Sequence, residues 1–264
     1  METGSPDEPV LARQDHDGVV TLCLNRPRQF NALSEELLDA LQRELDSIAA
    51  DASVRCVVIA AAGKAFCAGH DLRQMRATPT AEYYQALFAR CSRVMQALQT
   101  VPVPVIARVQ GLATAAGCQL VATCDLAVAA DDARFATPGV KIGLFCSTPM
   151  VALSRAVGRK KALEMLYTGD WVSADEAVRI GLINRAVPPA DLERETLALA
   201  ERIAAASRHV VGIGKAAFYR QVGLAQEQAY AYATNVMALN ALAHDAQEGM
   251  SAFLEKRQPT WENR

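Results

Sequence analysis

Two segments of the chain combine small residues with a change from a strand-like to a helix-like pattern. They are Lys64-Ala-Phe-Cys-Ala-Gly-His-Asp-Leu72 and Gly111-Leu-Ala-Thr-Ala-Ala-Gly-Cys-Gln-Leu120. Small residues let a ligand approach the backbone closely, and a helix start offers unpaired N–H groups at the positive end of its dipole. Two such turns that face each other can hold one developing oxyanion. The pattern therefore predicts an oxyanion hole built from backbone N–H groups.

Both turns belong to a longer series of motifs that resembles the enoyl-CoA hydratase/isomerase (crotonase) superfamily. The other motifs are Val20–Pro27, Asn31–Leu33, Ala162–Met165, Thr168-Gly169, Gly181-Leu182 and Glu248–Arg257, while Phe135–Val140 and Gly143–Pro149 resemble one branch of the superfamily. The resemblance implies an α/β fold, a crotonase-type spiral of ββα turns with a helical C-terminal region used in trimerisation. It also implies an acyl-CoA ligand, coenzyme A as part of the substrate, no prosthetic group, and a homotrimer or a hexamer made of two trimers.

The resemblance assigns the two oxyanion donors. They are the backbone N–H of His70, which follows the turn glycine, and the N–H of Ala116, which precedes the glycine of the second turn. Relatives often have glycine at the second position, but alanine keeps its N–H. The implied intermediate is a thioester enolate.

The acid/base positions depart from the pattern of the family's hydratases. Those enzymes carry glutamates where this chain has Gln119 and Gly139. One glutamate must activate water while the other handles the α-proton, and neither an amide nor a glycine can do this. The sequence thus argues against ordinary hydration and against single-base isomerisation. Restoring both carboxylates, by Gln119→Glu with Gly139→Glu, is expected to raise hydration strongly.

The resemblance also implies contacts with the coenzyme A part of the ligand. Arg28 is expected near the phosphates, and a cation near the 3′-phosphate has a clear electrostatic role. The turn around Gly69 is expected to line the adenine and pantetheine path, and the last helix of a neighbouring subunit to reach the adenosine. The residues implied for these contacts are Arg28, Ala68, Asp71, Leu72, Phe253 and Lys256.

Other side chains near these motifs leave the chemistry open. The side chain of His70 is a candidate acid or base, since imidazole ordinarily titrates near neutrality; the alternative is a histidine that hydrogen-bonds locally and orders its turn. Cys146 and Ser147 lie after Gly143-Leu144, in a segment that faces the acyl pocket in relatives, where they line the pocket or donate a hydrogen bond. Cys118 is more typical of a small core residue, and Asp71 is expected to cap the helix that follows it.

Two classes of function remain. As an enzyme, the protein is a lyase, isomerase, decarboxylase or thioesterase that acts on an acyl-CoA. Decarboxylation forms the enolate without a base, and thioester hydrolysis needs only an oriented water. The alternative is a non-catalytic sensor or partner subunit that binds a CoA thioester.

The bulk properties exclude several other classes. A chain of 264 residues fits one structural unit, which we divide into a spiral core with the site (1–194) and a helical C-terminal subdomain (195–264). A net charge of −2 without a basic stripe argues against nucleic acid, and no apolar run approaches membrane-spanning length. Seven separate cysteines indicate reduced thiols, and the four histidines lack metal-ligand spacing.

The polar, acidic start Met1–Glu8 resembles no targeting segment, so the expected location is cytoplasmic.

Alternation of strands and helices predicts the elements that position the turns. Expected strands are 19–25, 56–61, 103–109 and 124–130, with helices from Ser34 and over 80–98. Thr148 onward is expected to be helical to the end, with a capping box at Ser173–Glu176 and a helix start at Asp245.

Overall fold

The computed structural model of the protein describes residues 8–264. Its main sheet has six strands in the order β1-β2-β3-β4-β6-β9, and β1 is the antiparallel member. The strands are β1 Leu11–His16, β2 Val19–Leu24, β3 Cys56–Ala61, β4 Val105–Val109, β6 Leu126–Ala130 and β9 Arg185–Val187. A smaller sheet joins β5 Leu112–Thr114, β7 Arg134–Ala136 and β8 Val172–Ser173. The expectation about the N-terminal segment falls on residues 1–7, outside the described range.

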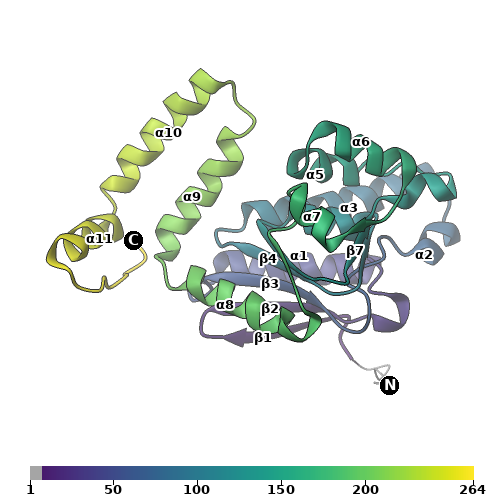
Figure 1. The fold of residues 1–264 in the computed structure, drawn as a ribbon, viewed down its shortest axis with the longest axis horizontal. Coiled ribbons are helices and arrows are strands. Elements are labelled where there is room, and N and C mark those ends of the chain that lie inside the picture. Colours follow the sequence, from purple (N-terminus) through teal and green to yellow (C-terminus); the bar gives the residue numbers. More distant parts are fainter. Residues whose placement is uncertain (1–7) are drawn as a thin grey trace.

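Helices cover the main sheet and continue beyond it (Figure 1). Their bounds are α1 Glu35–Ala50, α2 Leu72–Ala77, α3 Ala81–Thr100, α4 Ala116–Thr123, α5 Pro149–Ala156, α6 Arg159–Thr168, α7 Ala174–Arg179, α8 Leu192–Ala204, α9 Arg208–Gln221, α10 Gln226–Ala241 and α11 His244–Glu255. Within residues 8–264, no helix is both long and apolar enough to cross a membrane.

The core strands form because their side chains are apolar on both faces. All of β3 except Ala61 is buried, as expected for a parallel strand covered on both sides. The amphipathic α1 buries five aliphatic residues, and Ser34 caps it by accepting the N–H of Leu37. Thr80 caps α3 and Ser173 caps α7 in the same way. The caps expected from the sequence at Ser34 and Ser173 are therefore confirmed.

The expectation of an entirely helical C-terminal region is wrong. The strands β8 and β9 interrupt it, and β9 extends the main sheet by pairing with β6. Both strands have only two or three residues, too few for a period-two pattern to appear. The expected boundary near residue 195 falls within α8, which packs on the main sheet, and the division into two subdomains stays a prediction.

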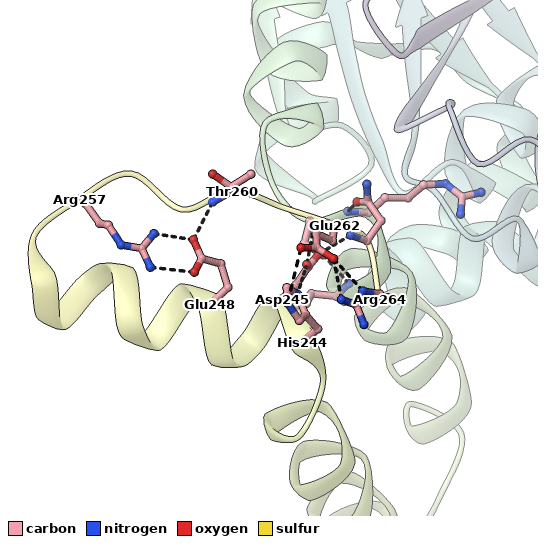
Figure 2. A network of polar contacts seen from close by, with 11 residues as sticks. His244, Asp245, Glu248, Arg257, Thr260, Glu262 and Arg264 are labelled. Carbon is pink, nitrogen blue, oxygen red and sulfur yellow. Dashed lines mark hydrogen bonds and ion pairs between the residues drawn. The ribbon is translucent and has the colours of Figure 1, made fainter.

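After α8 the chain forms a C-terminal arm, α9 to α11 with the tail to Arg264, which extends away from the sheet (Figure 1). The tail folds back along α11 (Figure 2). The buried carboxylate of Asp245 accepts hydrogen bonds from the Ser207 hydroxyl and from the N–H groups of Glu262 and Asn263. Glu248 binds both terminal nitrogens of Arg257, at 2.6 and 2.8 Å. The arginine lowers the pKa of Glu248 to about 2.

A buried polar cluster fastens the arm to the core. The Lys215 ammonium group donates to the carbonyls of Leu98 and Val103, at 2.7 and 2.9 Å, and to Asp125 at 2.7 Å. The same carboxylate accepts the Tyr219 hydroxyl at 2.7 Å. Burial lowers the pKa of Lys215, and Asp125 opposes that effect. The ammonium group has three N–H donors, and all three are used. These hydrogen bonds hold α9 in one position against the ends of the strands.

Replacing Lys215 by methionine should destabilise the protein by about 3 to 5 kcal/mol, because the Asp125 carboxylate, only 16% exposed, would lose its counter-charge. Urea unfolding at one fixed protein concentration measures this. The matched control is Lys141→Met, which removes an exposed ion pair with Asp170 and should cost at most about 1 kcal/mol. Equal losses in the two variants would contradict the assignment.

Candidate functional site

The two turns predicted from the sequence lie side by side, fastened by short backbone hydrogen bonds. Cys67 N–H donates to Leu112 at 3.0 Å, and Thr114 N–H donates back to Cys67 at 2.9 Å. The Thr114 hydroxyl adds a bond to the Ala68 carbonyl at 3.0 Å. A Cβ at Gly117 would lie 2.2 Å from the Cys67 carbonyl oxygen. Only glycine therefore allows the backbones to approach this closely.

This arrangement brings the N–H groups of His70 and Ala116 to the same place. Gly69, with φ +94°, turns the chain into His70, and a Cβ on it would lie 3.3 Å from the Ala116 nitrogen. Ala116 is the first residue of α4, where a helix cannot supply an acceptor. Neither N–H donates a hydrogen bond to any atom of residues 8–264. The two groups are thus available to one oxygen atom.

The residue before this donor has a strained backbone. Ala115 has φ 50° and ψ −118°, a region that non-glycine residues rarely occupy and that costs about 1 to 3 kcal/mol. Its N–H donates to Ala136 of β7, and its carbonyl accepts from Gln119 of α4. The surrounding sheet and helix hold the strained turn in place.

A cavity of about 540 Å³ opens beside the two turns. Its walls are mostly apolar and include no Asp or Glu from the described part of the chain. The lining residues are Ala68, His70, Leu72, Met75, Phe88, Thr114, Ala115, Ala116, Pro138, Gly139, Lys141, Ile142, Leu144, Phe145, Cys146, Ser147, Thr148 and Pro149. Seven residues singled out in the sequence therefore meet here: Ala68, His70, Leu72, Ala116, Gly139, Cys146 and Ser147.

Gln119 does not line this cavity. Its side chain is 5% exposed, and its amide oxygen is buried without a hydrogen-bond donor among residues 8–264. The hydroxyl of Thr137, which precedes Pro138, is also buried and has no hydrogen-bond partner among residues 8–264. Unpaired buried polar atoms are uncommon and often mark functional sites.

The space beside Gly139 is already filled. A Cβ at this position would lie 2.6 Å from the Leu144 carbonyl oxygen and 2.9 Å from the Cys146 sulfur. A glutamate cannot enter without moving the backbone of the 143–147 loop. We therefore correct the expectation that Gly139→Glu raises hydration. The new side chain would disrupt the cavity wall instead of supplying a carboxylate to it.

Asp71 has a structural position, as the expected helix cap. It accepts the N–H groups of Arg73 and Gln74 at the start of α2, and Arg26 at 3.1 Å. Burial would raise the pKa of Asp71, but these donors bring it below its ordinary value. The carboxylate does not line the cavity.

The remaining predicted contacts lie outside the cavity. Arg28 lies in the 3₁₀ turn Pro27–Gln29, and the neighbouring Phe30 carbonyl accepts the N–H of cavity residue Ala68. Phe253, 83% exposed, and Lys256 belong to α11 and its C-cap, far from the turns within one chain (Figure 1). Sequence reasoning missed Phe88 as a lining residue, because its pattern resembles an ordinary core position.

The imidazole of His70 lies against Phe88, edge to face, with ring centroids 5.4 Å apart. Both ring nitrogens are buried and have no hydrogen-bond partner in the described range. Burial lowers the pKa of His70 to about 4, so the ring is neutral at pH 7.

This shift makes stability depend on pH. Between pH 7 and 4.5 the unfolded chain binds a proton at His70 that the folded chain does not, so stability falls as the pH falls. With a folded pKa of about 4 against 6.5, the loss is about 2 to 3 kcal/mol. Urea unfolding at both pH values should show a loss that is larger by this amount in the native protein than in His70→Gln, because the carboxylates with lowered pKa values titrate in both proteins. Equal pH dependence in both would refute the buried neutral histidine.

Comparison with known proteins identifies the family. A model of the enoyl-CoA hydratase/isomerase family matches residues 14–264. The human enoyl-CoA hydratase domain-containing protein 3 is 48% identical over 257 residues, which cover 97% of this chain and 84% of that protein. A crystal structure of an enoyl-CoA hydratase from Mycobacterium smegmatis is 60% identical with a TM-score of 0.95, and the match covers 96% of this chain and 99% of that one. The human protein's crystal structure matches with 47% identity and a TM-score of 0.93, over 96% of this chain and all of that one.

These relatives correct one expectation from the sequence. The mouse, frog and human proteins at 47–48% identity are each named as mitochondrial. Their names contradict the expected cytoplasmic location, which rested on composition and on the absence of a recognisable targeting pattern.

The sequence match over nearly the whole chain agrees with the fold and with the position of the two turns. The chain belongs to the enoyl-CoA hydratase/isomerase family.

Proposed function

We propose that the protein binds an acyl-CoA thioester in the cavity and stabilises its enolate or oxyanion with the N–H groups of His70 and Ala116. The observation that carries this proposal is the pair of N–H groups without acceptors among residues 8–264, brought together by Gly69. Donors fixed by the fold need no reorganisation as charge develops on the oxygen, so they favour the charged state over the neutral thioester.

The coenzyme A part would leave the cavity past Ala68 and Leu72 towards the 3₁₀ turn that carries Arg28. Its phosphates would then meet a cation. Asp71 would act indirectly, by holding α2. Phe253 and Lys256 would reach the adenosine of a neighbouring subunit in a homotrimer or hexamer. The exposed apolar side chains of the arm, among them Tyr230, Leu239 and Leu242, support such an assembly, because large apolar patches usually mark interfaces.

The chemistry proposed here does not use a pair of carboxylates. Gln119 and Gly139 stand where hydratases of the family carry glutamates, and the lining residues of the cavity supply no substitute carboxylate. Reactions that form the enolate without a base, such as decarboxylation, fit this environment. The second candidate, a non-catalytic CoA-thioester sensor or partner subunit, is favoured by the inaccessible ring nitrogens of His70.

The oxyanion site can be tested without knowing the reaction. Acetoacetyl-CoA forms an enolate that absorbs ultraviolet light, and a site that stabilises this enolate should make it appear at pH 7 on adding protein. Gly69→Ala should abolish the signal, because the new Cβ would press on Ala115 and on the Ala116 nitrogen. The control is Gly158→Ala, where nothing lies within 4 Å.

A ligand comparison covers the case in which Gly69→Ala fails to fold. The native protein should bind butyryl-CoA more tightly than S-butyl-CoA, which lacks the carbonyl oxygen. Each hydrogen bond lost is worth about 1 kcal/mol, or roughly fivefold in affinity. Equal affinity together with no enolate signal would refute the proposed oxyanion site.

The absence of carboxylates predicts slow hydration. The native protein should hydrate crotonyl-CoA at least about 10²-fold more slowly than a hydratase with both glutamates, because a positioned acid or base contributes about 10²–10⁴-fold. Mass spectrometry of enoyl-, acyl-, malonyl-type and hydroxyacyl-CoAs after incubation measures this together with the other candidate reactions. Hydration at ordinary enzymatic rates would show that another group supplies the acid/base chemistry, whereas retention without turnover of any thioester would favour the sensor.

A further inference from the structure

Cys146 lies in the cavity wall at the place that a side chain at position 139 would fill. Its sulfur is 2.9 Å from the point where a Cβ of residue 139 would stand. The residue is 7% exposed and lines the cavity. Its carbonyl accepts the N–H of Met150 in the first turn of α5, at 2.9 Å. The thiol is therefore held on the same wall as Gly139.

The other nucleophilic atoms along the cavity are poorer candidates for covalent chemistry. The hydroxyls of Thr114, Ser147 and Thr148 are not acidic enough to ionise at neutral pH, and the Lys141 ammonium pairs with Asp170 at 3.0 Å. Cys146 supplies the one thiol among the lining residues of the described chain. The half-buried Cys23 lies on β2, away from the cavity.

We propose that Cys146 captures 2-enoyl-CoA thioesters covalently, by addition of its sulfur to the β-carbon. This inference rests on the proposed thioester site. A 2-enoyl thioester is electrophilic at the β-carbon because its carbonyl withdraws electrons through the double bond. Addition at that carbon moves negative charge onto the thioester oxygen, the atom assigned to the N–H groups of His70 and Ala116. One site thus serves both the binding and the capture.

The step balances without any further reactant. The S–Cβ bond forms, the π bond between Cα and Cβ breaks, and its electron pair becomes the enolate. The proton that leaves the sulfur ends on Cα, which gives a saturated β-thioether of the intact acyl-CoA. Burial raises the pKa of the Cys146 thiol, and the thiolate is the nucleophile. Capture should therefore be slow at pH 7 and should speed up about tenfold per pH unit below that pKa.

The test is mass spectrometry of the full-length protein after incubation with crotonyl-CoA. We expect one added mass equal to the whole of crotonyl-CoA, located by peptide mapping at Cys146. Butyryl-CoA, which is saturated, should add nothing, and an excess of it should slow the reaction of crotonyl-CoA. Cys146→Ser should lose the adduct. Cys23→Ser, the matched control at a more accessible thiol, should keep it.

Calorimetric binding of both thioesters separates the two proposals. If both bind and no adduct forms at Cys146, covalent capture is wrong and the thioester site stands. If neither binds, the proposed function fails and capture fails with it. An adduct at Cys23, or one that persists in Cys146→Ser, would show general alkylation of thiols and overturn the inference. Peptide mapping of the adduct on the native protein tests covalent capture at Cys146 even if Cys146→Ser does not fold.

Discussion

The site depends on the contact between two backbone turns, and this contact depends on the absence of side chains. The Cys67 carbonyl lies where any Cβ at Gly117 would have to be, and the bonds between 67 and 112–114 fasten the turns on either side. These bonds fix α4 relative to the chain that enters α2. The position of both candidate donors, and of the cavity beside them, follows from that one close approach.

The energetics of this region show preorganisation. Ala115 adopts a strained backbone, His70 is neutral against Phe88, and polar atoms of Gln119 and Thr137 are buried without partners in the described chain. Each of these features costs free energy in the folded protein. The core offsets the cost through the buried strands and through α1, whose apolar side chains are removed from water. A group of such features in one region of the fold is typical of a functional site.

Sequence patterns predicted the parts of the molecule that local chemistry controls. The caps at Ser34 and Ser173, the buried strand at 56–61 and the turns at Gly69 and Gly117 all follow from residue type and period. The resemblance to the family added the arrangement of these elements, a spiral of ββα turns followed by a helical C-terminal region. What the sequence could not give were distances between remote segments. Neither the crowding of Gly139 by Leu144 and Cys146, nor the withdrawal of Gln119 from the cavity, nor the short strand β9 has a local signal.

The carboxylate-free lining has a consequence for the electrical state of the cavity. His70 stays neutral because burial lowers its pKa to about 4, and Cys146 stays protonated because burial raises its pKa. Near neutral pH, neither group changes its charge. Titration of these two side chains therefore adds no pH dependence to ligand binding in that range.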